Sequence, residues 1–139
     1  MNKLWTPSET RISQSEMTRF QASFAEHLGQ PISDYGELHQ ASIDNSDAFW
    51  QHLVAFYDVI GDGDLSPVCT DYSFDSYAWF TNYRLNFAEN LLAKGADDAC
   101  ALQTIHESGK HTYITYAELR QQVANLQAAL RDYVQPGDV

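Results

Sequence analysis

Two runs of β-forming residues set the strongest limit on the fold, because the rest of the chain carries helical patterns or irregular sequence. Cys100–Ile105 and His111–Thr115 are separated by five residues that include Ser108 and Gly109. This spacing is typical of a β-hairpin. The sequence therefore predicts an α+β fold: N-terminal helices, an irregular acidic loop, one β-hairpin and a C-terminal helix.

Helix-start signals and apolar repeats predict the first helices. Ser13 and Glu16 fit a capping box, in which each side chain satisfies an orphan amide of the first turn. This helix is expected to end at Gly29, and its apolar stripe is Met17, Phe20, Phe24 and Leu28. Asp34 with Glu37 predicts a short helical turn further on.

A broader apolar helix is expected after residue 44, with Ser46 or Asp47 as its cap and Gly61 as its end. Its apolar residues are Phe49, Trp50, Leu53, Val54, Phe56, Tyr57 and Ile60. A stripe this wide predicts burial on more than one side. Trp50, Trp79 and Phe80 lack the basic neighbours of a base-stacking platform, so they are expected to be core residues.

The last third of the chain carries two further helix starts. Asn86 with Glu89 predicts a short helix over Phe87–Ala93, and Thr115 with Glu118 is a second capping box. The helix after Thr115 has one apolar face and should end at Pro136 and Gly137; that face is Leu119, Val123, Leu126 and Leu130. The closing Pro-Gly-Asp-Val resembles a connection from a helix to a strand, so the chain is expected to stop within a larger fold.

Charge excludes several classes of partner. The formal net charge is −11, and the stretch from Phe20 to Tyr83 contains no Lys or Arg. Its carboxylates are Glu26, Asp34, Glu37, Asp44, Asp47, Asp58, Asp62, Asp64, Asp71 and Asp75. Such a surface repels phosphate backbones and anionic headgroups, so neither nucleic acid nor a membrane is expected as a partner. We expect most of these carboxylates to form a solvated face, and residues 62–77 to be an irregular loop.

Cysteine usage and hydropathy indicate a soluble cytoplasmic chain. Cys69 and Cys100 are the only cysteines and lie in no metal-binding spacing. Both are expected to be buried reduced thiols, although the sequence leaves a disulfide between them open. No apolar run approaches the roughly 18 residues of a membrane span, and the N-terminus has no signal-peptide pattern.

No motif of catalysis or metal binding is complete. Ser108-Gly109-Lys110 is preceded by Thr104 where a phosphate loop needs Gly and followed by His111 where it needs Ser or Thr, so a hairpin turn is predicted. Asp62-Gly-Asp64 lacks the later ligands of an EF-hand, and the five histidines show no zinc-binding pattern. We therefore predict no catalytic, cofactor-binding or metal-binding residue within 1–139.

Four segments, taken together, carry a family resemblance. They are Leu4-Trp-Thr-Pro-Ser8, Phe49-Trp50, the stretch Trp79–Leu92 with its Leu-Asn-Phe-Ala-Glu-Asn-Leu-Leu ending, and Thr115-Tyr-Ala-Glu-Leu119 through Pro136–Val139. The chain resembles the N-terminal region of the acetoacetyl-CoA synthetases, in the adenylate-forming acyl-CoA ligase superfamily. The resemblance covers nearly the whole chain but only about the first fifth of such an enzyme.

The resemblance implies a two-step reaction for the parent protein. ATP and acetoacetate would form acetoacetyl-adenylate and pyrophosphate, and coenzyme A would then displace AMP. ATP, Mg and coenzyme A are thus implied for the parent, whereas the phosphate loop, the adenine-binding segment and the catalytic Lys of the family lie downstream. No cofactor is expected in this fragment.

Within that family, residues 1–95 are expected to be a helical N-terminal extension and 96–139 the start of the large adenylate-forming domain, an incomplete part of an α/β ligase fold. The fragment would be an inactive scaffold whose partner is the remainder of the ligase. Its expected buttress is Trp79, Phe80, Leu85, Phe87, Leu91 and Leu92. Self-association of the isolated fragment is a further expectation. Two alternatives remain. One is a stand-alone module whose acidic face binds a basic protein, and the other is a fragment of a ligase from a neighbouring subfamily that acts on another short acyl acid.

Overall fold

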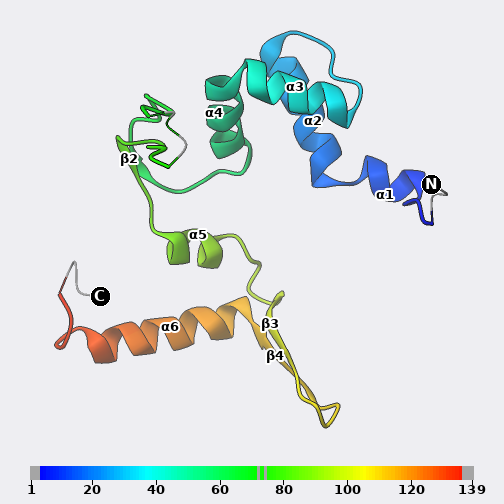
Figure 1. Ribbon diagram of the computed structural model, residues 1–139. Helices are drawn as coiled ribbons and strands as arrows, with labels where there is room; N and C mark the ends of the chain where they lie inside the picture. The colour runs from blue at the N-terminus through cyan, green and yellow to red at the C-terminus, as the bar shows by residue number, and fades with distance from the viewer. Residues whose placement is uncertain (1–3, 72, 74, 136–139) are drawn as a thin grey trace. The chain divides into compact units, whose positions relative to one another are not determined.

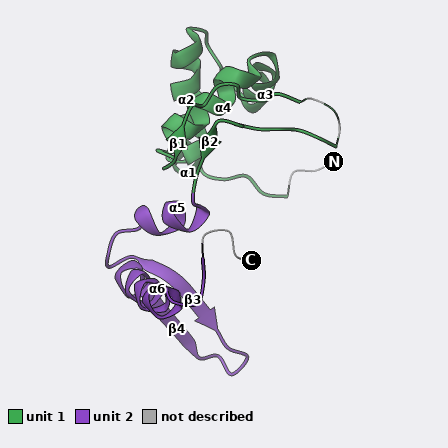
Figure 2. Cartoon of the chain, turned by 90° about the vertical axis from the view of Figure 1, so that its left-hand side faces the viewer, with its two compact units in different colours: residues 1–85 green, residues 86–139 purple. Residues whose placement is uncertain are grey.

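The computed structural model describes residues 4–71, 73 and 75–135, and the chain divides into two compact units, Met1–Leu85 and Asn86–Val139 (Figures 1 and 2). Unit 1 contains α1 (Glu9–Ser13), α2 (Glu16–Leu28), α3 (Tyr35–Asp44), α4 (Ser46–Phe56), β1 (Asp62–Gly63) and β2 (Tyr83–Arg84). Unit 2 contains α5 (Phe87–Ala93), β3 (Cys100–Ile105), β4 (His111–Thr115) and α6 (Tyr116–Leu130). The predicted α+β class is confirmed.

The start of the chain differs from the prediction at its first cap. Ser13 is the last residue of α1, a helix that the sequence reasoning missed and that Ser8 caps by accepting from the Arg11 amide at 3.3 Å. Ser15 caps α2 instead, by accepting from the Thr18 amide at 3.2 Å. Two serines two residues apart offered competing caps, and the chain uses the second for α2. That helix ends at Gly29, as predicted.

The core of unit 1 lies between α2, α3 and α4. Its buried residues are Phe20, Phe24, Ile32, Leu38 and Ala41. Phe49 of α4 meets both Phe20 and Phe24 edge-on, with ring centroids 5.4 Å apart in each pair. Burial of such rings is the main favourable term in folding this unit.

The helices α3 and α4 depart from the prediction in their extent. The Asp34 carboxylate caps α3 by accepting from the Glu37 amide at 2.9 Å, and α3 then continues to Asp44 and not for a single turn. The predicted cap of α4 at Ser46 or Asp47 is wrong, because Asn45 occupies that position without a side-chain bond to the helix. The end predicted at Gly61 is also wrong, since α4 ends at Phe56.

The irregular segment after α4 is held by short stretches of strand pairing and by a side-chain hydrogen bond. Asp62 pairs with Arg84 in the short β1–β2 ladder, and the Tyr83 hydroxyl donates to the Val59 carbonyl at 3.0 Å. Cys69 forms an isolated antiparallel bridge with Trp79. The predicted irregular loop over 62–77 is confirmed apart from β1; Tyr72 and Phe74 lie outside the described residues.

The hairpin and the helix starts that the sequence predicts are present in unit 2. The strands β3 and β4 pair antiparallel with Ile105 opposite His111, and Gly109 takes a positive φ of 78° in the turn. Thr115 and Glu118 form the predicted capping box at the start of α6. The helix ends at Leu130, so the end predicted at Pro136 and Gly137 is wrong; those two residues lie outside the described part of the chain.

Candidate functional site

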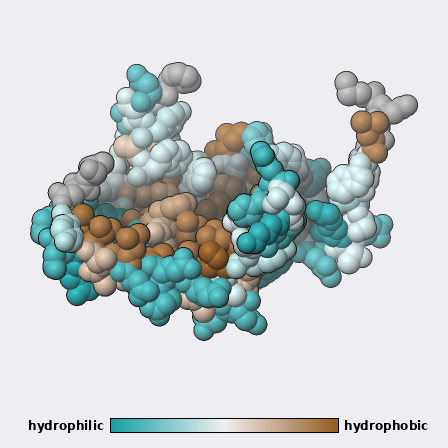
Figure 3. All heavy atoms as spheres, turned by 90° about the horizontal axis from the view of Figure 1, so that it is seen from below, coloured by the Kyte–Doolittle hydropathy of each residue, from teal (hydrophilic) through white to brown (hydrophobic). Residues whose placement is uncertain are grey.

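The apolar faces of unit 2 are uncovered. No residue of the described part of this unit, 86–135, is buried, whereas unit 1 holds a buried core. The exposed large apolar residues are Phe87 and Leu91 of α5, Leu102, Ile105 and Tyr113 of the hairpin, Val123, Leu126 and Leu130 of α6, and Tyr133 and Val134 after it. Apolar side chains (brown) accordingly show at the surface along α6 in Figure 3. Exposed apolar surface of this kind is typical of sites that contact other proteins, membranes or ligands.

Arg120 of α6 fixes the position of α5. Its guanidinium donates to the carbonyl oxygens of Leu92 at 2.6 Å and Gly95 at 3.1 Å, and it pairs with the Asp97 carboxylate. The cation also lies over the Tyr116 ring, 5.6 Å from its centroid. One side chain therefore satisfies main-chain acceptors at and after the end of α5. No motif in the sequence reasoning singled out this arginine.

Gly95 allows the turn after α5 to approach α6 closely. A Cβ atom at this position would lie 2.1 Å from the Tyr116 ring. The Tyr116 amide also donates to the Ala99 carbonyl at 3.0 Å, which ties the start of α6 to the segment before β3. These contacts hold α5, the hairpin and α6 in one arrangement, with their apolar residues left at the surface.

The six predicted buttress residues fall into two groups. Trp79, Phe80 and Leu85 belong to unit 1, and Phe87, Leu91 and Leu92 belong to unit 2. Trp50 and Trp79 form a T-shaped pair with centroids 5.3 Å apart, but they are 36% and 41% exposed. The prediction that these two tryptophans are core residues is wrong within this chain, because no described element covers their outer faces.

The predicted burial of α4 on more than one side is also wrong within this chain. The side that holds Phe49, Leu53 and Phe56 packs on the core, whereas Trp50 is exposed. Tyr57 and Ile60 lie beyond the end of the helix and are exposed as well. The cysteines divide in the same way: Cys69 is buried as predicted, but Cys100 is exposed. Both thiols are free, which closes the question of a disulfide between them.

The charged groups of unit 1 form the solvated face that the sequence predicted. All ten carboxylates between residues 20 and 83 are exposed. Two hydrogen bonds from Ser73, from its amide at 2.9 Å and its hydroxyl at 2.7 Å, lower the pKa of the Asp71 carboxyl. Within the described residues, no three His, Cys, Asp or Glu side chains come together as a group that could hold a metal ion.

Two histidines meet at the contact between α2 and α4. The rings of His27 and His52 lie 4.9 Å apart, and His52 Nε2 shares a 3.0 Å hydrogen bond with the Ser23 hydroxyl. Burial lowers the pKa of His52, and the neighbouring His27 lowers it further. Phe20 and Phe24 also contact the His52 ring, which makes this histidine part of the helix packing.

The predicted hairpin turn at Ser108-Gly109-Lys110 is confirmed. The Gly109 amide donates to the His106 carbonyl at 2.9 Å, and the His106 amide donates to the Lys110 carbonyl at 2.9 Å. These bonds close the β3–β4 connection and use the main chain of the turn itself.

No helix in the described part of the chain has both the length and the apolar character of a membrane span.

Several known proteins are similar to this chain in sequence. No family model matches the chain. The acetoacetyl-coenzyme A synthetase of Rhizobium meliloti is 37% identical over 131 residues, and that match spans 92% of this chain and 20% of the relative. The acetoacetyl-CoA synthetase of Macaca fascicularis is 31% identical over 139 residues, spanning 97% of this chain and 20% of the relative. A malonamoyl-CoA synthetase of Penicillium aethiopicum is 30% identical over 143 residues, with the same two coverages.

A solved structure of an acetoacetyl-CoA synthetase is also similar to this chain. The acetoacetyl-CoA synthetase from Streptomyces lividans superposes with a TM-score of 0.84 at 38% identity, over 99% of this chain and 22% of that chain. The chain thus spans about one fifth of the length of the relatives it matches. The predicted family resemblance is confirmed: in sequence and in fold, the chain is a relative of the acetoacetyl-CoA synthetases and corresponds to about one fifth of such a protein.

Proposed function

We propose that the chain is the N-terminal scaffold portion of an ATP-dependent ligase. In this proposal, the complete ligase joins acetoacetate to ATP as acetoacetyl-AMP, releases pyrophosphate, and transfers the acyl group to the thiol of coenzyme A. The names of the relatives support this assignment of substrate, and the alignments to about a fifth of each relative support the assignment as a portion. ATP, Mg and coenzyme A would be bound by the remaining sequence of the ligase.

The observation that carries the scaffold role is the absence of buried residues among the described residues of unit 2. Covering one large apolar side chain stabilises a protein by about 1.5–3 kcal/mol. Phe87, Leu91 and Leu126, which are 56–72% exposed, would gain this stabilisation only when further protein covers them. The remainder of the ligase is the partner that supplies such a surface.

The charge of unit 1 supports a structural and not a catalytic role. Stabilising a pyrophosphate leaving group requires preorganised cations and hydrogen-bond donors. The stretch from Phe20 to Tyr83 has no Lys or Arg and carries ten carboxylates. We further propose that residues 1–95 are the helical extension of the ligase and that 96–139 open its adenylate-forming domain.

A replacement experiment tests the proposal. Residues 1–139 would replace the aligned segment of the Streptomyces lividans synthetase, and acetoacetyl-CoA formation would be measured for the chimera, for that synthetase without the segment, and for the 139-residue chain alone. We expect activity from the chimera and none from the other two. Acetoacetyl-CoA formation by the chain alone, or a soluble folded chimera without activity, would contradict the proposal.

A stand-alone interaction module is the second candidate, and the exposed acidic face of unit 1 favours it. The reading frame that follows the codon of Val139 separates the two. A phosphate loop encoded there in frame supports the ligase, whereas a stop codon supports the module. Calorimetry adds a second measurement: the scaffold proposal predicts no heat when ATP or coenzyme A is titrated into the chain.

A further inference from the structure

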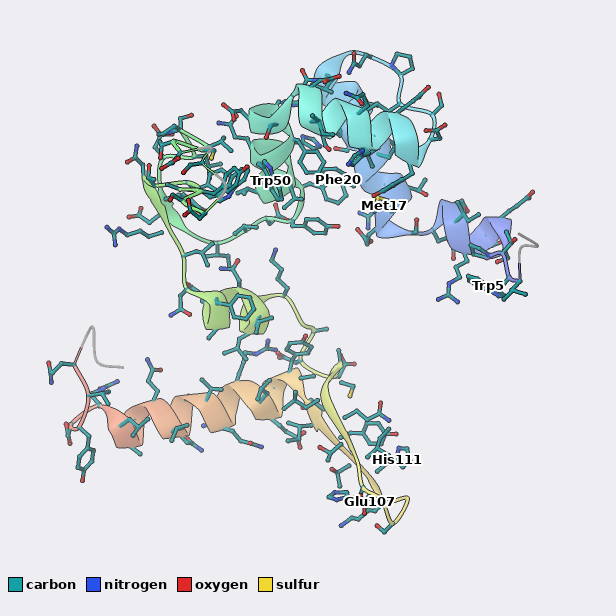
Figure 4. The ribbon with its side chains drawn as sticks, in the orientation of Figure 1. Trp5, Met17, Phe20, Trp50, Glu107 and His111 are labelled. Atoms are coloured by element: carbon teal, nitrogen blue, oxygen red, sulfur yellow. The ribbon has the colours of Figure 1, made fainter. Side chains whose placement is uncertain are left out.

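A hollow of about 440 Å³ lies on unit 1, where α1, the start of α2 and the start of α3 meet. Its lining includes Trp5, Arg11, Ile12, Met17, Asp34 and Tyr35. Trp5 lies beside α1, and Met17 lies in the first turn of α2 (Figure 4). The volume is within the range of ligand pockets, which is about 300–1,000 Å³.

Hydrogen bonds hold the elements on both sides of the hollow. The Thr18 hydroxyl donates to the Ile12 carbonyl at 2.7 Å, which ties α1 to α2. On the other side, Gln21 Nε2 donates to the Ile32 carbonyl at 2.9 Å and holds the segment that leads into α3 against α2. The two aromatic residues of the lining are each 68% exposed. A ligand can therefore reach the hollow while unit 1 stays folded.

Arg11 brings a positive charge to the hollow without a carboxylate partner of its own. Its guanidinium group lies over the Trp5 ring, 5.9 Å from the centroid, and makes no hydrogen bond or ion pair within the described residues. Arg19, in contrast, pairs with Glu16. The planar guanidinium group presents its N–H groups in a geometry that matches a carboxylate. Arg11 is thus able to pair with the carboxylate of a ligand.

Asp34 brings the opposite charge to the same hollow. Its Oδ1 atom accepts from the Glu37 amide at 2.9 Å, whereas its Oδ2 atom accepts no hydrogen bond within the described residues. No ion pair joins Asp34 to Arg11 there, so the two charges leave each other free. The rest of the lining includes the apolar side chains of Ile12 and Met17. A matching ligand combines a carboxylate, a hydrogen-bond donor and an apolar group.

The last residue of a polypeptide carries these three groups on one Cα atom, and capture of a terminal carboxylate is a recurring mode of peptide recognition. We propose that the hollow lined by Trp5, Arg11 and Asp34 is a docking site for the C-terminus of a protein chain that ends in an apolar residue. Arg11 pairs with the terminal carboxylate, Asp34 accepts from the last main-chain N–H group, and the apolar side chain contacts Met17. This inference concerns unit 1 alone and does not rest on the proposed ligase function.

Nuclear magnetic resonance of the ¹⁵N-labelled 139-residue chain tests the site, because each of the 3 tryptophans gives its own indole N–H signal. The probe is the peptide acetyl-Gly-Gly-Leu with a free carboxylate. We expect the signal of Trp5 to shift and those of Trp50 and Trp79 to stay in place. The C-terminal amide of the same peptide should shift the Trp5 signal much less. Equal shifts with the two peptides, or no shift of Trp5 with the free acid, would overturn the proposal.

A third peptide separates a chain terminus from an acidic side chain within a chain. Acetyl-Gly-Glu-Gly-amide carries one carboxylate but lacks the terminal arrangement of carboxylate, N–H group and apolar side chain. It should bind more weakly than the free acid of acetyl-Gly-Gly-Leu. Equal affinity would overturn the assignment of the hollow to a C-terminus.

Two arginine variants separate the hollow from general electrostatic attraction. Arg11→Gln should weaken binding of the free acid about tenfold, the equivalent of one hydrogen-bonded charge pair at an accessible site. Arg19→Gln makes the same change in net charge at an exposed position outside the hollow and should weaken binding much less. Equal losses in the two variants would overturn the proposal. The comparison of the three peptides uses the unchanged chain, so it decides the matter even where a variant fails to fold.

Discussion

Arg120 donates a hydrogen bond of 2.6 Å to the carbonyl oxygen of Leu92, and this bond joins α6 to the last turn of α5. The same guanidinium reaches the Gly95 carbonyl at 3.1 Å. Carbonyl groups at the end of a helix have no partner within that helix, so a charged donor there is worth more than an ordinary hydrogen bond. The packing of unit 2 depends on this residue because the unit has no buried apolar residue of its own among those described.

Replacing Arg120 by Met should weaken the attachment of α5 to α6. Hydrogen bonds from charged groups contribute about 1.5–3 kcal/mol, and the partial exposure of this side chain reduces that value to about 1–2 kcal/mol. Hydrogen exchange of the α5 and α6 amides would measure the loss as a lower free energy of local opening. Asp97→Asn is the matched control. Its carboxylate is 84% exposed, so the ion pair contributes little. Equal losses in both variants would show that the main-chain bonds are unimportant.

Gly95→Ala should destabilise unit 2 through a steric clash with Tyr116. The added Cβ would lie 2.1 Å from the ring, and a packed ring cannot move without losing its contact with Arg120. Combining this change with Tyr116→Ala should remove most of the penalty of Gly95→Ala. A double-mutant cycle followed by hydrogen exchange measures the coupling, which we expect to be about 1 kcal/mol or more. Additive effects would show that the two residues do not meet.

Local signals predicted most of the elements, because caps, turns and periodicity are encoded within a few residues. The Asn86 cap, the Thr115–Glu118 capping box and the hairpin turn at Gly109 are examples. The first cap was missed because Ser13 and Ser15 offer the same chemistry, and only the packing of α1 before α2 decides between them. Burial was harder to predict. Periodicity identifies an apolar face but not what covers it, so Trp50 and Trp79 were expected in the core.

Contacts between residues that are distant in the chain are also hard to predict from the sequence. Arg120 is one arginine in a helix, and its role depends on a turn 25 residues earlier in the chain. No spacing rule relates such partners. The ring contact of Trp50 with Trp79 likewise joins α4 to a segment that has almost no regular structure.

The stability of unit 1 should fall as the pH drops from 8 to 5.5, in part through His52. Burial and His27 lower the pKa of this histidine in the folded state. Below the ordinary histidine pKa of about 6.5, the unfolded chain therefore takes up a proton at residue 52 that the folded chain resists, and the equilibrium shifts toward unfolding. Urea unfolding followed by tryptophan fluorescence measures the change.

His52→Gln is the comparison that isolates this histidine, since glutamine can keep the bond to Ser23 but does not titrate. Protonation of the many carboxylates also alters stability at low pH, and the variant shares that effect. We expect the variant to lose less stability than the parent chain over the same pH interval. His106→Gln, in the hairpin turn, should behave as the parent chain does. An identical pH dependence in all three would rule out a contribution of His52.

The isolated chain should self-associate through unit 2. The exposed apolar residues of α6 and the open edges of the two-stranded hairpin both favour pairing with another copy. Light scattering at increasing protein concentration should show a rising mean mass. Leu126→Glu, at a residue that is 61% exposed, should reduce the rise without changing the fold, and Gln127→Glu provides a control for the added charge. A constant monomer mass at high concentration would contradict this expectation.

The melting temperature of Phe87→Ala in the chimeric ligase, with the KM for ATP measured on the same sample, tests whether further protein covers unit 2. Phe87 is 72% exposed in this chain, and the scaffold account holds that the remainder of the ligase covers it. We expect a lower melting temperature with an unchanged KM for ATP, while Lys110→Ala in the hairpin turn should change neither. An unchanged melting temperature together with a loss of ATP binding would contradict it.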